Sequence, residues 1–171
     1  MPDRCPLRDG DSLTRNVSVK LTLKTTFPVP ADQVWALINQ SSTLLYVCKG
    51  LLGFGSSEHF PQQWREGDIH VTRLLFFGCI PAWKHTLRFE RIDDDQRVLA
   101  TKEGGGLVPV WNHVIQVVPD GNRSSTYSDE VNIEAGIFTI VVWLYAHVFY
   151  RYRQRRWRKL LREIAHHSSS I

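Results

Sequence analysis

An apolar segment that runs directly into a strongly basic one dominates the end of this chain. Residues 135–150 carry no Asp, Glu, Lys or Arg, whereas residues 151–162 read RYRQRRWRKLLR. One stripe crosses both segments at alternating steps of four and three: Trp143, His147, Tyr150, Gln154, Trp157, Leu161 and Ile164. This spacing places residues on one helical face, while Arg151, Arg155, Arg158 and Arg162 recur on another. The sequence therefore predicts a long C-terminal helix that packs against a large partner.

The apolar part of this helix is too short for a simple membrane span. It covers 16 residues, from 135 to 150, and contains His147, whereas a span needs about 20 apolar residues. We therefore expect a buried helix. The alternative is a helix lying at a membrane interface, with its basic flank on anionic lipid.

The length of 171 residues favours one domain. We expect a flexible tail over residues 1–15, a single domain over 16–165 and a disordered tail over 166–171. The N-terminal residues lack the apolar stretch of a secretory signal, and three widely spaced cysteines (Cys5, Cys48 and Cys79) form no disulfide or zinc pattern. A cytoplasmic location is the simplest expectation.

The positive charge is confined to the terminal helix. Residues 151–163 hold seven Lys and Arg and one Glu, a net +6, so the chain's total of +4 leaves −2 for all other residues. A nucleic-acid-binding domain usually spreads its basic residues over a face or groove. The charge distribution therefore disfavours nucleic acid as a partner, although Arg interleaved with aromatic residues is also found on single-strand-binding surfaces.

Alternating apolar and polar residues before this helix predict strands. The predicted strands cover 17–27, 60–64, 69–77, 82–92, 97–103, 108–118 and 124–134. Pro28 and Pro30 end the first strand, and two short helices follow over 31–38 and about 41–47, before a glycine-punctuated loop at 50–55. Short turns between the later strands predict an antiparallel meander.

Side chains alternate across a strand, so residue parity selects the inner face of the sheet. The inward set in 82–92 is Trp83, His85, Leu87, Phe89 and Arg91. The inward sets in the last two strands are Trp111, His113, Ile115 and Val117, and Tyr127, Asp129, Val131 and Ile133. The predicted inner face is thus mostly aromatic and aliphatic, with polar exceptions at His85, His113 and Asp129.

The turn between the last two strands suggests how these polar residues meet. If Val118 faces Ser124, then His113 faces Asp129 directly, and a slip by two residues makes the pair diagonal. Such a pair satisfies the buried polarity of both groups. Glu103 on a neighbouring strand could reach His85 in the same way. A metal site built from these four residues would require all of them to converge, and no compact ligand motif supports one, so we predict neither metal nor cofactor.

The order of these elements resembles the START-like, helix-grip superfamily, which includes SRPBCC proteins, polyketide cyclases and aromatases, and lipid-transfer domains. The resemblance rests on Phe27-Pro28-Val29-Pro30-Ala31 through Val34-Trp35, on Glu66-Gly67-Asp68, on Trp111 and His113, and on Asp129 with Val131. It implies an α+β helix-grip fold: an antiparallel, curved sheet of about seven strands wrapped around the long C-terminal helix, with two short helices after the first strand. A deep apolar cavity between sheet and helix is also implied. The resemblance carries over no catalytic residue, because members differ and many are not enzymes.

Two functions follow from this reading. The first is binding or transport of a hydrophobic small molecule (a lipid, polyketide, sterol or quinone-like compound). Its predicted pocket residues are Trp83, Leu87, Phe89, Trp111, Ile115, Tyr127, Val131, Trp143 and His147. The alternative is a cyclase, aromatase or dehydratase in which His113 is the acid or base, Asp129 orients it and His85 is a second proton donor. Arg151, Arg155, Arg158 and Arg162 are candidates for contact with an anionic membrane surface or a protein.

Overall fold

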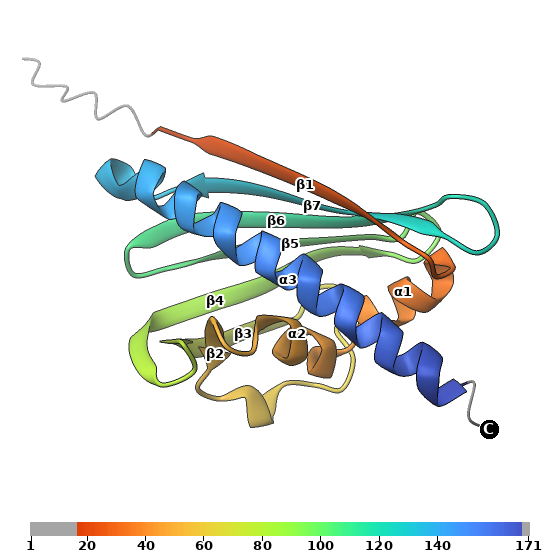
Figure 1. Cartoon of the computed structure of the whole chain (residues 1–171). Helices are drawn as coiled ribbons and strands as arrows, with labels where there is room; N and C mark the ends of the chain where they lie inside the picture. The colour runs from red at the N-terminus through yellow and green to blue at the C-terminus, as the bar shows by residue number, and fades with distance from the viewer. Residues whose placement is uncertain (1–16, 169–171) are drawn as a thin grey trace, which may run out of the picture.

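A seven-stranded antiparallel sheet in the order β1-β7-β6-β5-β4-β3-β2 forms the body of the molecule in the computed structural model, which describes residues 17–168 (Figure 1). The strands are β1 (Val19–Phe27), β2 (Leu52–Phe54), β3 (Ile69–Phe76), β4 (Ile80–Asp93), β5 (Val98–Gly105), β6 (Val108–Pro119) and β7 (Ser125–Glu134). The helices are α1 (Ala31–Ile38), α2 (Ser41–Cys48) and α3 (Thr139–Ser168), with short 3₁₀ turns η1 (Ser57–His59) and η2 (Gly136–Phe138). The predicted arrangement, a curved sheet around a C-terminal helix, is confirmed.

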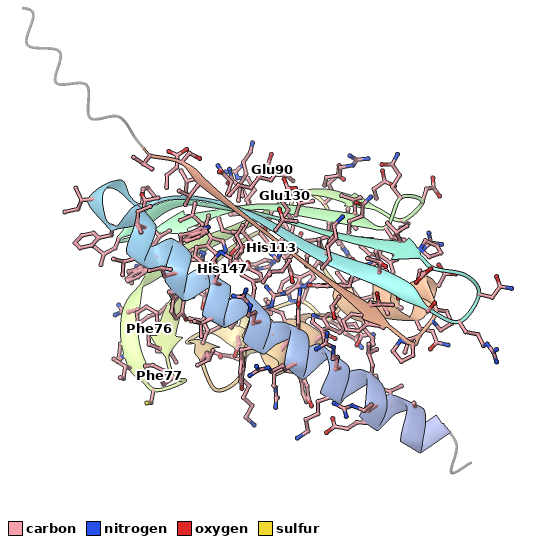
Figure 2. All side chains as sticks on the ribbon, turned by 45° about the horizontal axis from the view of Figure 1, so that its top comes forward. Phe76, Phe77, Glu90, His113, Glu130 and His147 are labelled. Carbon is pink, nitrogen blue, oxygen red and sulfur yellow. The ribbon has the colours of Figure 1, made fainter. Side chains whose placement is uncertain are left out.

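The curvature of the sheet comes from irregularities in three strand pairs. The register shifts between Arg73 and Leu75, between Phe89 and Arg91, and between Glu103 and Gly105. Bulges of this kind bend a strand and increase its twist. The sheet therefore curls over α3 and leaves space between them. Its outer face is charged, as Glu90 and Glu130 show in Figure 2, and Glu130 pairs with Lys20 at 2.5 Å.

The second of these irregularities corrects one prediction. Parity along β4 placed Arg91 on the inner face, but the register shift after Phe89 reverses the alternation. Arg91 is exposed and donates hydrogen bonds to Asp93 and Gln96. Parity arguments hold only as far as the next bulge, and nothing in the local composition marks this one.

The position of β2 corrects a second prediction. The strand expected at 60–64 is absent, and within it only Gln63 forms an isolated bridge, with Gln40. The edge strand is instead Leu52–Phe54, inside the segment predicted to be a loop, and it pairs with β3. Phe60 and Trp64 pack their rings together at 5.3 Å. These aromatic residues, which suggested a strand, instead pack against each other through their side chains.

Helix α3 crosses the inner face of the sheet for 30 residues. It begins where the Thr139 hydroxyl accepts a hydrogen bond from the Ala135 amide at 2.9 Å and donates one to the Gly136 carbonyl at 2.8 Å. The helix continues to Ser168 and so includes residues 166–168 of the tail predicted at 166–171. The tail predicted at 1–15 and residues 169–171 lie outside the described residues. Within residues 17–168, no helix has the length and apolar character needed to cross a bilayer.

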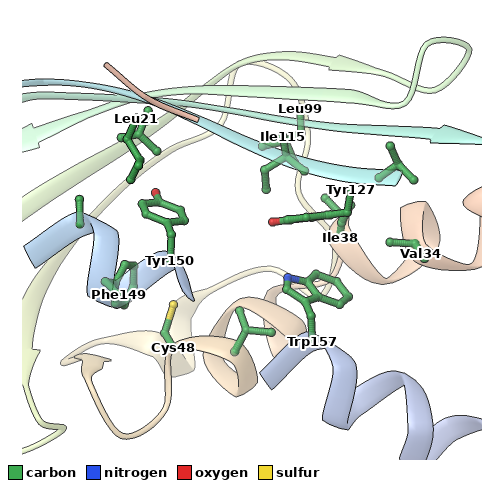
Figure 3. Packing of buried hydrophobic residues seen from close by; sticks show 14 of the residues in the cluster. Leu21, Val34, Ile38, Cys48, Leu99, Ile115, Tyr127, Phe149, Tyr150 and Trp157 are labelled. Carbon is green, nitrogen blue, oxygen red and sulfur yellow. The ribbon is translucent and has the colours of Figure 1, made fainter. Parts of the chain in front are cut away.

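The core lies where the second half of α3 meets β1, β7 and the two short helices. Trp157 is 1% exposed, and its ring lies 5.6 Å from that of Tyr127 and 6.2 Å from that of Phe27. Figure 3 shows Trp157 and Tyr150 rising from α3 toward Tyr127 and Ile115 of the sheet. Since each buried aromatic ring contributes a few kcal/mol, this half of the helix anchors the fold and its first half remains beside an open space.

Candidate ligand-binding cavity

A cavity of about 330 Å³ lies between the inner face of the sheet and the first half of α3. Its walls come from α2, β2 and β3, from the inner faces of β4, β5 and β6, and from α3 between Val141 and Arg153. The lining is almost entirely aliphatic and aromatic. Val141 lines the cavity and is also 65% exposed, so the cavity reaches the surface near the start of α3.

The β5–β6 turn positions one wall of the cavity. Gly106 has φ +51°, and a Cβ at this position would overlap the Trp83 ring. A Cβ at Gly105 would overlap the Lys84 carbonyl. Only glycine permits this turn to lie so close to β4. The turn thereby packs closely against Trp83. The Trp83 ring also contacts the Phe76 ring edge-on, with 5.6 Å between the ring centres.

Two histidine–carboxylate pairs bring polarity to the inner face. Nε2 of His113 lies 2.9 Å from Oδ1 of Asp129, which also accepts a hydrogen bond from the Tyr127 hydroxyl at 2.7 Å. Nε2 of His85 lies 3.2 Å from Oε2 of Glu103. Both histidines line the cavity and are buried, with 4% and 6% of their surface exposed, respectively. Figure 2 shows His113 between the sheet and α3.

Both carboxylates of these pairs stay ionised. Burial alone would raise the pKa of Asp129, but the hydrogen bond from His113 and the charge of Arg153 lower it below its usual value. Burial likewise opposes ionisation of Glu103, but the hydrogen bond and charge of His85 lower the pKa. An ionised carboxylate accepts and cannot donate. Nε2 of each histidine must therefore carry the proton, which leaves Nδ1 as the nitrogen that could exchange a proton with a ligand.

The His113–Asp129 contact is present in the diagonal arrangement that was the alternative, and the direct register is wrong. His113 faces Val131, and Asp129 faces Ile115, so the pairing is shifted by two residues and the His113–Asp129 contact is diagonal. The reason is a turn centred one residue later in the chain, in which Pro119 pairs with Ser125 and the Asp120 amide donates a hydrogen bond to the Ser124 carbonyl. A shift by two preserves which side chains face inward. The predicted His85–Glu103 contact is present as well.

Arg153 is the charged residue that the sequence did not single out. It lines the cavity from α3 and is 5% exposed, and its guanidinium carbon lies 5.0 Å from the centre of the Tyr150 ring. Burial opposes its charge, but Tyr127 and Asp129 raise its pKa above the usual value. A smaller cavity of about 40 Å³ on its other side shares Arg153, Glu103 and His113 with the large one.

The predicted pocket residues fall into three groups. Trp83, Leu87 and Trp111 line the large cavity, and Phe89 and Ile115 line the small one, as Leu87 also does. Tyr127 and Val131 line neither, because they pack into the core under the second half of α3. Trp143 and His147 also lie elsewhere: their rings contact each other at 4.3 Å, and Trp143 donates to the Lys20 carbonyl of β1.

The sequence predicted the wrong face of α3 as the wall of the cavity, because the stripe through Trp143 and His147 was taken to face the ligand. The cavity meets Val142, Tyr145, Phe149 and Arg153, which follow one another at steps of three and four. The same spacing that revealed the core stripe was thus available for these four residues. This second stripe was not recognised, because it ends in an arginine, Arg153, which was expected to be exposed.

The four arginines expected on the outer face of α3 are exposed. Arg158 donates to the Thr25 hydroxyl, and Arg162 donates to the Arg158 carbonyl. Within residues 17–168, no three His, Cys, Asp or Glu side chains come close enough together to hold a metal ion. His85, Glu103, His113 and Asp129 thus form two separate pairs.

No protein-family model matches this sequence, and no curated protein matches it. Among solved structures, norcoclaurine synthase from Thalictrum flavum, in complex with dopamine and hydroxybenzaldehyde, aligns over 95% of this chain and 98% of its own with TM-score 0.63 and 16% identity. A protein from Chromobacterium violaceum aligns over 82% and 96% with TM-score 0.65 and 9% identity. This chain has the helix-grip fold.

The helix-grip fold recurs in a third solved structure, a protein from Mycobacterium smegmatis. That protein aligns over 83% of this chain and 90% of its own, with TM-score 0.60 and 14% identity. The predicted resemblance to the START-like superfamily is therefore confirmed at the level of the fold. The space between the sheet and α3 of this chain holds the cavity of about 330 Å³.

Proposed function

We propose that this protein binds a hydrophobic small molecule between the sheet and α3 and carries or presents it. The observation that carries the proposal is the cavity of about 330 Å³ with its aliphatic and aromatic walls. Small-molecule sites typically have volumes of about 300–1,000 Å³, apolar linings and a few convergent polar groups. The cavity has all three features.

The walls favour a flat or elongated ligand with rings or a chain, of the lipid, polyketide, sterol or quinone-like classes. Aromatic side chains stand on opposite sides of the space, Trp83 and Trp111 on the sheet and Tyr145 and Phe149 on the helix. Rings in such positions stack on planar ligands or pack along aliphatic chains. The similar norcoclaurine synthase was solved with dopamine and hydroxybenzaldehyde, two small aromatic molecules, which supports this class.

Native mass spectrometry of the purified protein, followed by organic extraction, tests the proposal. We expect either a co-purifying apolar molecule or, for protein that is empty after extraction, stoichiometric binding of 2-naphthalenemethanol as a neutral aromatic probe. If no molecule co-purifies and the probe does not bind, the proposal fails.

A matched pair of substitutions on β3 locates the binding. Leu74 is buried and lines the cavity, whereas Val71 is 59% exposed on the same strand. We expect Leu74→Trp to fill the cavity and to weaken probe binding by about ten-fold or more, since the probe's apolar burial is lost. Val71→Trp, which adds the same side chain on the outer face, is expected to leave binding unchanged.

The His113–Asp129 pair supports a second candidate, an enzyme of the cyclase, aromatase or dehydratase type. His113 lines both cavities, and the bond to Asp129 fixes its ring. A fixed, buried histidine next to an apolar site is suited to proton transfer. If the extracted molecule is converted by the protein, we expect His113→Gln to abolish conversion while binding is retained. Unchanged conversion in that variant would remove His113 from the mechanism.

Contact between an anionic surface and the exposed arginines of α3 is part of the proposal. Arg151, Arg155, Arg158 and Arg162 are all exposed. We expect sedimentation with phosphatidylserine vesicles at low salt, and its loss in an Arg151→Glu, Arg155→Glu double variant, because each basic residue near such a surface contributes about 1 kcal/mol. Equal sedimentation of the two proteins would exclude this surface.

A further inference from the structure

A buried arginine without a partner sits at the inner end of the cavity. Arg153 is 5% exposed, and its Nε is fully buried and has no hydrogen-bond partner among residues 17–168. Its closest described neighbours include the faces of the Tyr150 and Phe149 rings, at 5.0 and 5.9 Å from the guanidinium carbon. Ring faces support the charge but accept no proper hydrogen bond from the guanidinium edge. Taking an arginine out of water without hydrogen bonds is costly, so its presence needs a reason.

The nearby carboxylates do not supply that reason. Oδ1 of Asp129 is bound to both His113 and Tyr127, while its Oδ2 is buried without a hydrogen-bond partner among residues 17–168. Glu103 is bound to His85 and Thr101. Among residues 17–168, neither carboxylate forms an ion pair with Arg153, although the charge of Asp129 acts on it from a greater distance. Both carboxylates are thus hydrogen-bonded to histidines, and Arg153 has no ion-pair partner among residues 17–168.

Other unpaired donors surround the same space. Within the described part of the chain, the indole Nε1 of Trp83 and the hydroxyl of Tyr145 are buried without hydrogen-bond partners, and both residues line the cavity with Arg153. The indole N–H and the guanidinium are hydrogen-bond donors only, and the tyrosine hydroxyl can donate as well as accept. A ligand that satisfied these three groups would have to present acceptor oxygens.

We propose that Arg153 binds a carboxylate or another anionic oxygen group of the ligand, whose apolar body fills the cavity toward Val141. This inference rests on the proposed function and narrows the ligand from any hydrophobic molecule to a hydrophobic acid. The planar guanidinium fork matches a carboxylate with two parallel hydrogen bonds, which a lysine cannot reproduce. Arg153 lines the inner end of the cavity and Val141 its exposed end, on the same helix.

Three probes with one skeleton test the inference: 2-naphthoate, 2-naphthalenemethanol and 2-naphthylmethylammonium, titrated by calorimetry. We expect wild-type protein to bind the acid about ten-fold or more tightly than the alcohol, since hydrogen bonds to a charged group contribute more than those to a neutral one. The ammonium is expected to bind most weakly. Preference for the ammonium would mean that Glu103 and Asp129 dominate the site and would overturn the inference.

Substitutions assign the preference to Arg153. We expect Arg153→Gln to weaken 2-naphthoate about ten-fold and to change the affinity of the alcohol less than about two-fold, with Arg153→Lys in between. Arg156→Gln is the matched control, because Arg156 lies three residues away on α3, where it contacts Tyr46 and lines neither cavity. Circular dichroism establishes that each variant is folded.

The outcomes separate the two proposals. If the alcohol binds and the acid has no advantage, or Arg153→Gln leaves the advantage intact, the inference fails and the cavity remains a neutral binding site. If none of the probes binds and nothing co-purifies, the proposed function itself fails. Should Arg153→Gln not fold, the wild-type preference and Arg153→Lys decide.

Discussion

The buried histidine–carboxylate pairs behave as single ionic units at the residue scale. Asp129 has no exposed surface, and its carboxylate holds both His113 and Tyr127. Removing one member of such a pair leaves a buried charge or donor without compensation. The pairs therefore stabilise the sheet's inner face and also make it sensitive to acid.

Asp129→Asn tests this sensitivity. The pKa of folded Asp129 lies below its ordinary value of 3.8, so its contribution to stability is fully present above that value and is lost as the pH falls through the folded-state pKa. We expect the variant to lose about 2–4 kcal/mol at neutral pH. Its unfolding free energy should also vary less between about pH 5 and pH 2.

Urea unfolding at several pH values measures both effects. Glu130→Gln is the control, because Glu130 is its neighbour in β7 but lies on the outer face with Lys20. An acid dependence that is the same in Asp129→Asn and wild type would show that other groups govern acid unfolding.

The cysteines give a second prediction at this scale. Burial raises the pKa of Cys48 to about 11, whereas Cys79 is exposed. Because the thiolate is the reactive form, we expect iodoacetamide at about pH 8 to modify Cys79 quickly and Cys48 only after unfolding. Peptide mass mapping over time distinguishes the two sites, and rapid labelling of Cys48 would mean that the cavity opens widely to water.

Single residues also show which features of the site could be predicted from the sequence. Alternation placed His85, His113 and Asp129 on the inner face, because a pleated strand leaves few alternatives there. It failed at Arg91, since a bulge changes parity without a compositional sign. Arg153 was missed for a different reason: charge was taken to indicate exposure, although Phe149, Arg153 and Trp157 are spaced four residues apart on one helical face.

At the scale of elements, α3 serves several neighbours with different faces. Phe149 and Arg153 line the cavity, and Trp157 lies in the core. A neighbouring side of the helix, which includes Arg156, contacts α2. On that side Arg156 donates two hydrogen bonds to the Tyr46 carbonyl at 3.0 and 3.2 Å, with its guanidinium 4.1 Å from the Tyr46 ring centre. The arginines of this segment therefore lie in different surroundings, with Arg153 in the cavity, Arg156 against α2 and Arg155 exposed.

Arg156→Ala is expected to destabilise the fold by about 1–2 kcal/mol, because it removes charged hydrogen bonds and a ring contact between α2 and α3. Thermal and urea unfolding measure the change. Arg155→Ala, one residue away on the exposed face, should lie within about 0.5 kcal/mol of wild type. Equal effects in both variants would show that only helix charge matters.

The short strand was beyond sequence reasoning for a physical reason. A strand of three residues, such as β2, is too short to display an alternating pattern. Long strands such as β4 and β6 were found because 14 and 12 residues give the pattern room to repeat. The fold's outline was thus predictable from its long elements, whereas the cavity's edges, which β2 and the bulges shape, were not.

At the scale of the whole molecule, one end of the barrel-like sheet is apolar on the outside. Ile137 is 91% exposed, Phe77 62% and Leu107 58%. They belong to η2, which precedes α3, and to the β3–β4 and β5–β6 turns, and these segments lie at the same end in Figure 1. The cavity reaches the surface at this end through Val141. We therefore expect ligands to pass there.

Val141→Trp tests this route. A bulky side chain at the opening should slow both association and dissociation of 2-naphthoate, so that the equilibrium affinity changes less than either rate. Stopped-flow fluorescence measures the two rates. Val148→Trp is the control, since Val148 is 63% exposed on the same helix and does not line the cavity, and identical rates in both variants would place the route elsewhere.

The pairing of the first strand with the last has a consequence for how the molecule is made. Val19 pairs with Ile133, and α3 packs against β1. Contacts between residues so distant along the chain form late and slow folding. During synthesis β1 must therefore wait as an unpaired edge, exposed to pairing with other chains, until nearly the whole sheet has left the ribosome. The alternation of Lys20, Thr22 and Lys24 on its outer side suits that interval, because charged edges resist association.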